Sequence, residues 1–287
     1  MTGTAICLMG PRASGKTTYL ASLVAISLKE RLSGVQIRPS GAAVDKLKDL
    51  VVNFIKEKIN VPPTPPEEEI SYRFDIEFTA VKRVPKNTKL ELSIKDYSGE
   101  RLNDLFKDIT KEQLSTNQKK ELQNFLDDCF RVDRWLVMLS EWEPGKDKEV
   151  YEPIFEKLCN EIDGRQKKNK AIRGLRIAVV MTKCERGEIW TGRLEPEEDL
   201  FKVRLPSTYS LLKRRLIPNE RLRFFACSSF GVMGDRDPRP NRYINDNDGT
   251  PAEYRCVLQD YQRWQPYGVI APLYWLTTGQ ELQNECL

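Results

Sequence analysis

The chain has 287 residues, of which 40% are hydrophobic and 31% charged, and this composition predicts one elaborated globular domain over residues 1–287. The net charge of +4 is too small to indicate nucleic-acid binding, and the absence of histidine excludes histidine bases and histidine-ligated metals. Seven scattered cysteines without a CxxC pair indicate reduced thiols. Because no run of 18 apolar residues occurs and the apolar start at residues 5–9 is too short for a signal peptide, we expect a cytoplasmic protein without a membrane span.

The first predicted element is a buried parallel strand at the apolar residues 4–9. The letters GPRASGKT follow at residues 10–17 and match G-x-x-x-x-G-K-[ST], a loop whose backbone NH groups and lysine bind phosphates while its threonine hydroxyl faces magnesium. Residues 17–30 repeat apolar side chains at helical spacing, so the loop enters a helix N-terminus, where the dipole favours anions. The alternative is a glycine turn between core elements. The predicted phosphate-binding residues are Gly10, Arg12, Ala13, Ser14, Gly15, Lys16, Thr17 and Thr18.

The rest of the chain alternates strand-like and helical segments. An inserted helical segment is expected at about residues 40–60, and the alternating runs at 71–81 and 89–95, separated by PKN, predict a hairpin. Further strands are predicted at residues 135–139, 175–181 and 222–226, and helices at 102–130, 149–162, 200–216 and 269–283. This order predicts an α/β fold with a doubly wound, mostly parallel sheet flanked by helices, whose ligands gather at the carboxyl ends of the strands. Residues 230–266 are expected to form a long loop of the kind that often carries partner contacts.

Polar motifs follow three of these predicted strands. Residues 89–95 run into DYSGE, where Asp96 suits a magnesium site reached through water and the NH of Gly99 suits a γ-phosphate; a plain β-turn is the alternative. Residues 175–181 end in TKCE, and residues 222–226 end in CSSFG. An ordinary polar strand end is the alternative for both.

In the order GPRASGKT, DYSGE, TKCE and CSS, the chain resembles the Ras-like P-loop GTPases from about residue 4 to residue 229. The opening and the ending PYGVIAPLYWLTTG look more narrowly like the bacterial double-GTPase-type domains of conflict and signalling operons, although a buried helix would also account for the ending. The resemblance implies a molecular switch that binds GTP or GDP with Mg²⁺. Its implied partner is a protein effector or a partner GTPase from the same operon.

The resemblance also implies how a guanine base would be read. Thr182 opens the TKCE motif and Lys183 would lie along the base, while Glu185 would accept from the ring NH and the exocyclic amine. The family usually has aspartate there, so the longer glutamate shifts the geometry and puts guanine specificity in question. Ser228 would brace the loop, and the NH of Ser229 would meet the base carbonyl oxygen.

The remaining assignments concern magnesium and hydrolysis. Thr64 is the candidate switch threonine and would join Thr17 and Asp96 at the metal, although the flanking prolines fit a plain connector nearly as well. Glu100 stands where the family usually has glutamine; a carboxylate cannot donate to water or phosphate, so slow hydrolysis is expected.

Arg12 and Arg101 would place a guanidinium on developing charge, with surface arginines as the alternative. Together with Lys16 and Glu100 they complete the predicted catalytic set. A related ATPase and a nucleotide-dependent interaction module with little or no hydrolysis remain open as other functions.

Overall fold

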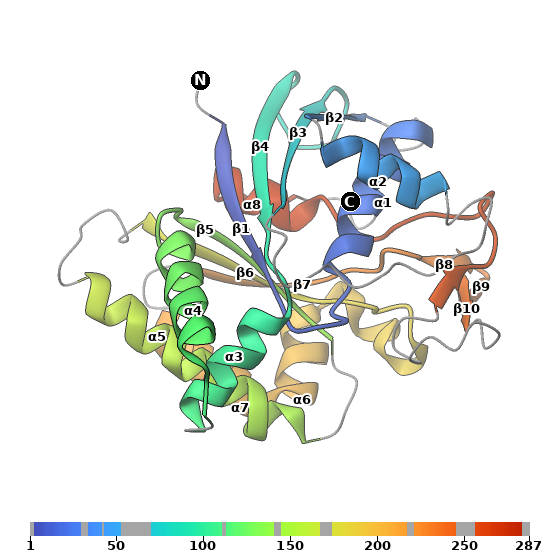
Figure 1. Ribbon diagram of the computed structural model, residues 1–287. Coiled ribbons are helices and arrows are strands. Elements are labelled where there is room, and N and C mark those ends of the chain that lie inside the picture. The colour runs from blue at the N-terminus through green and yellow to red at the C-terminus, as the bar shows by residue number, and fades with distance from the viewer. Residues whose placement is uncertain are drawn as a thin grey trace.

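The computed structural model describes residues 3–29, 34–41, 43–52, 70–110, 113–140, 145–166, 174–216, 221–244 and 256–282. Its centre is a seven-stranded sheet of order β2-β3-β4-β1-β5-β6-β7 (Figure 1). The strands are β1 Thr4–Met9, β2 Val35–Ser40, β3 Ile70–Phe78, β4 Thr88–Asp96, β5 Arg134–Leu139, β6 Arg176–Met181 and β7 Leu222–Ala226. Strands β4, β1, β5, β6 and β7 run parallel, and β2 and β3 add antiparallel pairings at one edge. The predicted α/β class with a mostly parallel sheet is therefore confirmed.

Helices cover both faces of this sheet (Figure 1). Their bounds are α1 Lys16–Lys29, α2 Ala43–Val52, α3 Glu100–Ile109, α4 Thr116–Cys129, α5 Glu152–Gln166, α6 Lys202–Arg204, α7 Pro206–Leu216 and α8 Ala271–Thr278. Successive side chains of a strand point to opposite faces, so Ile6 and Leu8 of β1 pack with α1, α2 and α8, while Cys7 and Met9 pack with α3, α4, α5 and α7. Burial on both faces explains why β1 reads as an unbroken apolar run.

Two predictions about individual elements need correction. The helix predicted at residues 102–130 is two helices, because α3 ends at Ile109 and a capping box starts α4. In that box Ser115 Oγ accepts from the NH of Gln118 at 3.2 Å, and Gln118 Oε1 accepts from the NH of Ser115 at 3.0 Å. The edge strand β2 was not predicted. The hairpin of β3 and β4 was predicted, and the antiparallel register of the two strands confirms it.

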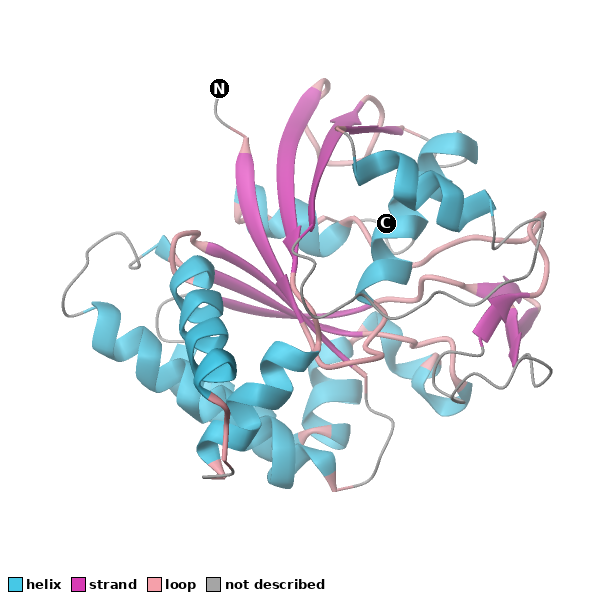
Figure 2. Cartoon of the chain, viewed as in Figure 1, coloured by secondary structure: helices cyan, strands magenta, loops and turns pink. Residues whose placement is uncertain are grey.

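The segment at residues 230–266, which we call the C-terminal insert, was predicted to be a long loop, and this is also corrected. Its described residues, 230–244 and 256–266, contain two pairs of short antiparallel strands, which Figure 2 shows beside the main sheet rather than in it. These strands are β8 Val232–Gly234 with β9 Asp237–Pro240, and β10 Arg242–Ile244 with β11 Cys256–Leu258. Runs this short show too little alternation to be recognised from the sequence.

Within the described ranges, no helix has both the length and the apolar character that crossing a membrane requires.

Candidate functional site

The predicted motifs follow four of the five parallel strands, so they lie at one edge of the sheet. The first motif forms the loop between β1 and α1, where Ala13 and Gly15 have positive φ angles of 60° and 91°. Lys16 folds back over this loop, and its Nζ donates to the carbonyl oxygens of Gly10 at 2.9 Å and Pro11 at 3.2 Å. Burial lowers the pKa of Lys16, and the nearby charge of Asp96 opposes that shift. Thr17 and Thr18 follow in the first turn of α1.

The side chain of Asp96 lies at the carboxyl end of β4, next to β1. It is 1% exposed, and among the described residues neither of its carboxylate oxygens has a hydrogen-bond partner. Burial raises its pKa to about 6, with the charge of Lys16 opposing the shift. The buried Oγ of Ser14 likewise has no hydrogen-bond partner in the described part of the chain. A buried carboxylate without donors is the kind of oxygen ligand that Mg²⁺ prefers, so these residues fit a magnesium and phosphate site.

The turn after Asp96 packs directly on the phosphate-binding loop. A Cβ on Gly99 would lie 2.4 Å from the backbone nitrogen of Arg12 and 2.8 Å from the carbonyl carbon of Pro11, so only glycine fits this approach. Glu100 begins α3, and its Oε1 lies 3.8 Å from Nη1 of Arg12, in an ion pair whose side chains are both largely exposed. The first residues of α3 are therefore in contact with the loop that would hold phosphate.

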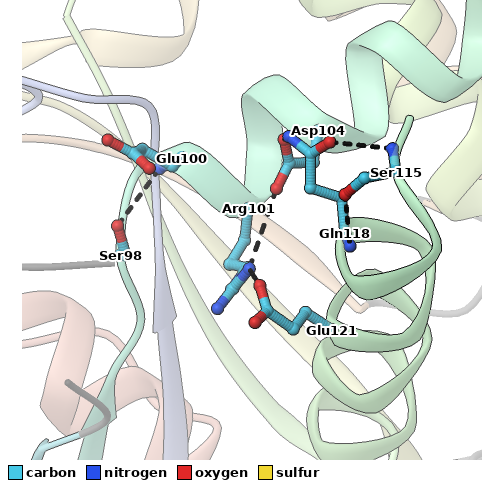
Figure 3. Close-up of polar contacts among 7 residues, drawn as sticks. All are labelled: Ser98, Glu100, Arg101, Asp104, Ser115, Gln118 and Glu121. Carbon is cyan, nitrogen blue, oxygen red and sulfur yellow. Dashed lines mark hydrogen bonds and ion pairs between the residues drawn. The ribbon is translucent and has the colours of Figure 1, made fainter. Parts of the chain in front are cut away.

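Arg101 lies one residue further on but is engaged elsewhere. Figure 3 shows its guanidinium directed at Glu121 of α4, with Nη1 2.5 Å from Glu121 Oε2 and 3.7 Å from Asp104 Oδ2. Gln118 of α4 also donates to Asp104, at 3.4 Å. Arg101 thus ties α3 to α4 in this structure, and its predicted contact with developing phosphate charge stays a prediction.

The two motifs predicted to read a base meet at the ends of β6 and β7. Thr182 Oγ1 donates to the carbonyl oxygen of Ser14 at 2.7 Å and so joins TKCE to the phosphate-binding loop. Lys183 has a positive φ of 59°, and burial, followed by the charge of Arg186, lowers its pKa to about 8. Glu185 is 1% exposed and accepts a hydrogen bond on Oε2 from Ser228 Oγ at 2.7 Å.

The Ser228 loop is held by the chain near residue 267. Ser228 and Tyr267 exchange backbone hydrogen bonds of 2.9 Å in both directions, and Ser228 Oγ accepts from the NH of Gly231 at 2.7 Å. The indole NH of Trp264 donates to the carbonyl oxygen of Ser229 at 2.8 Å. These contacts fix the backbone from which Ser228 reaches Glu185.

One residue at this site was missed in the sequence. Arg242 of β10 places its Nε 3.1 Å from Oε1 of Glu185. No local motif marks it, and the only signal was a basic segment at residues 236–242. The candidate switch residue Thr64 lies outside the described residues.

No protein-family model and no curated protein matches this chain. Solved structures with a similar arrangement of elements include the Arl6 small GTPase of Trypanosoma brucei with a bound nucleotide analogue, at 10% identity over 79% of this chain and 88% of that one, with a TM-score of 0.36. The Ski7 GTPase-like domain of S. cerevisiae bound to GTP is 13% identical over 88% of this chain, with a TM-score of 0.39. This chain spans 48% of that Ski7 chain.

Proposed function

We propose that this protein is a GTP-binding molecular switch that uses Mg²⁺ and hydrolyses GTP slowly. The observation that carries the proposal is the buried carboxylate of Asp96, which has no hydrogen-bond partner among the described residues and lies within electrostatic reach of Lys16. A structural aspartate buried to this degree is normally hydrogen-bonded or paired at close range. A carboxylate kept free of donors beside a phosphate-binding loop suits a bound cation.

At the phosphate end, Lys16 would exchange its two carbonyl acceptors for phosphate oxygens, which are charged and bind it more strongly. Thr17 and Asp96 would hold Mg²⁺, with Thr64 as the proposed third residue. When bound, the metal ion neutralises charge on the phosphates. The backbone NH groups from residue 13 onward lead into α1, whose N-terminal dipole adds to the attraction for an anion.

The switch would work through Gly99 and α3. Because the turn at Gly99 lies against the backbone of Arg12, a γ-phosphate bound beside this loop would make a hydrogen bond with the turn or displace it. A movement of the first turn of α3 would reach α4 through the ion pair of Arg101 with Glu121. Presence or loss of the γ-phosphate would thereby alter a surface formed by two helices.

Hydrolysis is proposed to be slow because Glu100 cannot donate a hydrogen bond to phosphate and carries a negative charge. Its proximity to Arg12 reduces this charge effect only in part, since both side chains are largely exposed. The protein would act as one domain in the cytoplasm on a protein effector or a partner GTPase. The narrower resemblance to bacterial double-GTPase-type domains supports that choice of partner.

The test is a calorimetric titration of the purified protein with GTP, GDP, ATP and ADP, each with and without Mg²⁺. We expect guanine nucleotides to bind with Mg²⁺ and Lys16→Ala to abolish binding while circular dichroism stays unchanged. Lys89→Ala is the matched control, because Lys89 lies on the exposed part of β4 beside Glu77.

Two results would change the proposal. Unchanged affinity in folded Lys16→Ala would refute the phosphate site, and equal binding of ADP and GDP would favour the related ATPase. Single-turnover phosphate release then separates a slow GTPase from an interaction module that does not hydrolyse its nucleotide.

A further inference from the structure

The carboxylate predicted to read guanine already has a partner on each of its oxygens. Ser228 Oγ donates to Oε2 of Glu185 at 2.7 Å, and Nε of Arg242 lies 3.1 Å from Oε1. The Glu185 side chain is 1% exposed and the Arg242 side chain 12% exposed. Glu185 follows β6 and Ser228 follows β7, whereas Arg242 comes from the C-terminal insert. The contact of Arg242 is an ion pair without hydrogen-bond geometry at Nε among the described residues, and it places the guanidinium against the oxygen that a base edge would need.

The position of Arg242 is fixed by its neighbours. The preceding residue, Asn241, is fully buried; its Nδ2 donates to the carbonyl oxygen of Asp260 and its Oδ1 accepts from the NH of Asp260, both at 2.8 Å. Arg242 itself pairs with Leu258 across β10 and β11, and its Nη1 lies 2.8 Å from Cys256 Sγ. The insert thus presents one guanidinium to one carboxylate from a well-defined backbone.

The charges around Glu185 favour exchange of this partner. The charge of Glu185 acts on Lys183 and Arg186 as well as on Arg242, and the pKa of Arg186 is lowered by burial first and by the charge of Arg242 second. Three cations close to one anion repel one another in a poorly hydrated place. Replacing Arg242 by a neutral donor would relieve that repulsion and return the guanidinium to water.

Guanine is such a donor. Its ring NH and exocyclic amine lie side by side, which is the donor pattern that a guanidinium edge presents to a carboxylate. Adenine has a ring nitrogen acceptor in the corresponding place and lacks this pattern. In this structure Arg242 brings one such NH group, at Nε, to Oε1 of Glu185, where guanine would bring two donors.

We propose that Arg242 competes with guanine for Glu185, so that the base displaces this arginine and the C-terminal insert responds to base occupancy. The inference rests on the proposed function. It makes Arg242 a residue that sets the affinity for guanine, and it makes the C-terminal insert a segment that senses the bound base. Because the contact involves the base and not the γ-phosphate, GDP and GTP would displace Arg242 alike, whereas the turn at Gly99 would respond to GTP alone.

Binding of GDP and of tripolyphosphate to four proteins tests the proposal: wild type, Arg242→Gln, Arg242→Ala and Arg239→Ala. Arg239→Ala is the matched control, since Arg239 is 75% exposed on β9 and pairs with Asp237. We expect Arg242→Gln to bind GDP about three- to tenfold more tightly, as for loss of a competing charge pair. Tripolyphosphate has no base, so its affinity should be the same in all four. Arg242→Gln keeps a polar side chain should Arg242→Ala fail to fold.

Two further measurements sharpen the test. In a protein that already carries Glu185→Gln, Arg242→Gln should have no effect on GDP affinity, because the ion pair between Arg242 and Glu185 has already been removed. In wild type, GDP should speed hydrogen exchange of the backbone amides at residues 237–244 and 256–260, and tripolyphosphate should not.

Each other outcome decides against the inference. Weaker GDP binding by Arg242→Gln would make Arg242 a contact of the base, and unchanged GDP binding would mean that it does not compete. Wild-type binding of tripolyphosphate, with no GDP binding by wild type or by either Arg242 variant, would overturn the inference and leave the phosphate site standing. Binding of neither ligand to wild type would refute the proposed function itself.

Discussion

Replacing Asp96 by asparagine should make the nucleotide-free protein more stable at neutral pH. Asp96 is 1% exposed and has no hydrogen-bond partner among the described residues, so its negative charge opposes folding unless a cation is bound. Asparagine has nearly the same shape without the charge. We therefore expect a substitution in the proposed metal site to raise the free energy of unfolding.

The size of this effect follows from the pKa. Burial raises the pKa of Asp96 from 3.8 to about 6, and at about 1.36 kcal/mol for each pH unit the ionised side chain lowers the free energy of unfolding by about 3 kcal/mol. Because the pKa is higher in the folded state than in the unfolded state, the protonated side chain stabilises the fold. This contribution to the free energy of unfolding is fully present below pH 3.8 and is lost as the pH rises through about 6. The advantage of Asp96→Asn should therefore be near its maximum at pH 8 and small at pH 4.

Urea denaturation at pH 4, 6 and 8 in the presence of EDTA measures the difference. Asp75→Asn is the control for the change in net charge, because Asp75 is exposed on the neighbouring strand β3. With Mg²⁺ and GTP the sign should reverse, since only wild type keeps the carboxylate for the metal. A variant no more stable than wild type at pH 8 without ligand would refute the reasoning.

Three other substitutions test the contacts of α3. Gly99→Ala places a Cβ 2.4 Å from the Arg12 backbone nitrogen and should lower the free energy of unfolding by about 1–3 kcal/mol in urea titrations, whereas Gly164→Ala, with open space around it in α5, should raise it slightly; equal effects would contradict the close contact. Glu100→Gln should speed single-turnover phosphate release, because the amide can donate to phosphate without adding repulsion; a slower rate at unchanged GTP affinity would make Glu100 a working catalytic group. Arg101→Ala removes the ion pair with Glu121 that joins α3 to α4, and the weaker one with Asp104 within α3, and should cost about 1–3 kcal/mol of thermal stability with little change in rate; a slower rate at unchanged stability would place the guanidinium on the phosphate.

The sequence predicted what local patterns encode. Strand β1 was recognisable because both of its faces are buried, and the β3–β4 hairpin because its apolar residues alternate. Parallel strands then bring Lys16, Asp96 and Glu185 to the same edge of the sheet without further information. The break between α3 and α4 was missed, although Ser115 and Gln118 have the spacing of a capping box, which marks the N-terminus of α4.

Contacts between distant segments were beyond this kind of prediction. Strand β2 contains Arg38 and Pro39 and takes its structure from pairing with β3 rather than from its own residues. The approach of Arg242 to Glu185 depends on how the C-terminal insert packs, and no spacing in the sequence encodes it. The direction of Arg101 was equally open, because a side chain at the start of a helix can turn toward the ligand or toward the next helix.

The hold of residues 264–268 on the Ser228 loop has a consequence for how each molecule is made. Residues 10–17, Asp96 and Glu185 leave the ribosome well before Trp264 and Tyr267, the residues that hold the Ser228 loop in place. Until those residues appear, a growing chain would have the proposed phosphate end of the site without a fixed base end. The stabilisation that a bound nucleotide gives to a folded protein would then become available only late in synthesis. Nucleotide binding would in this way distinguish finished molecules from partly made ones.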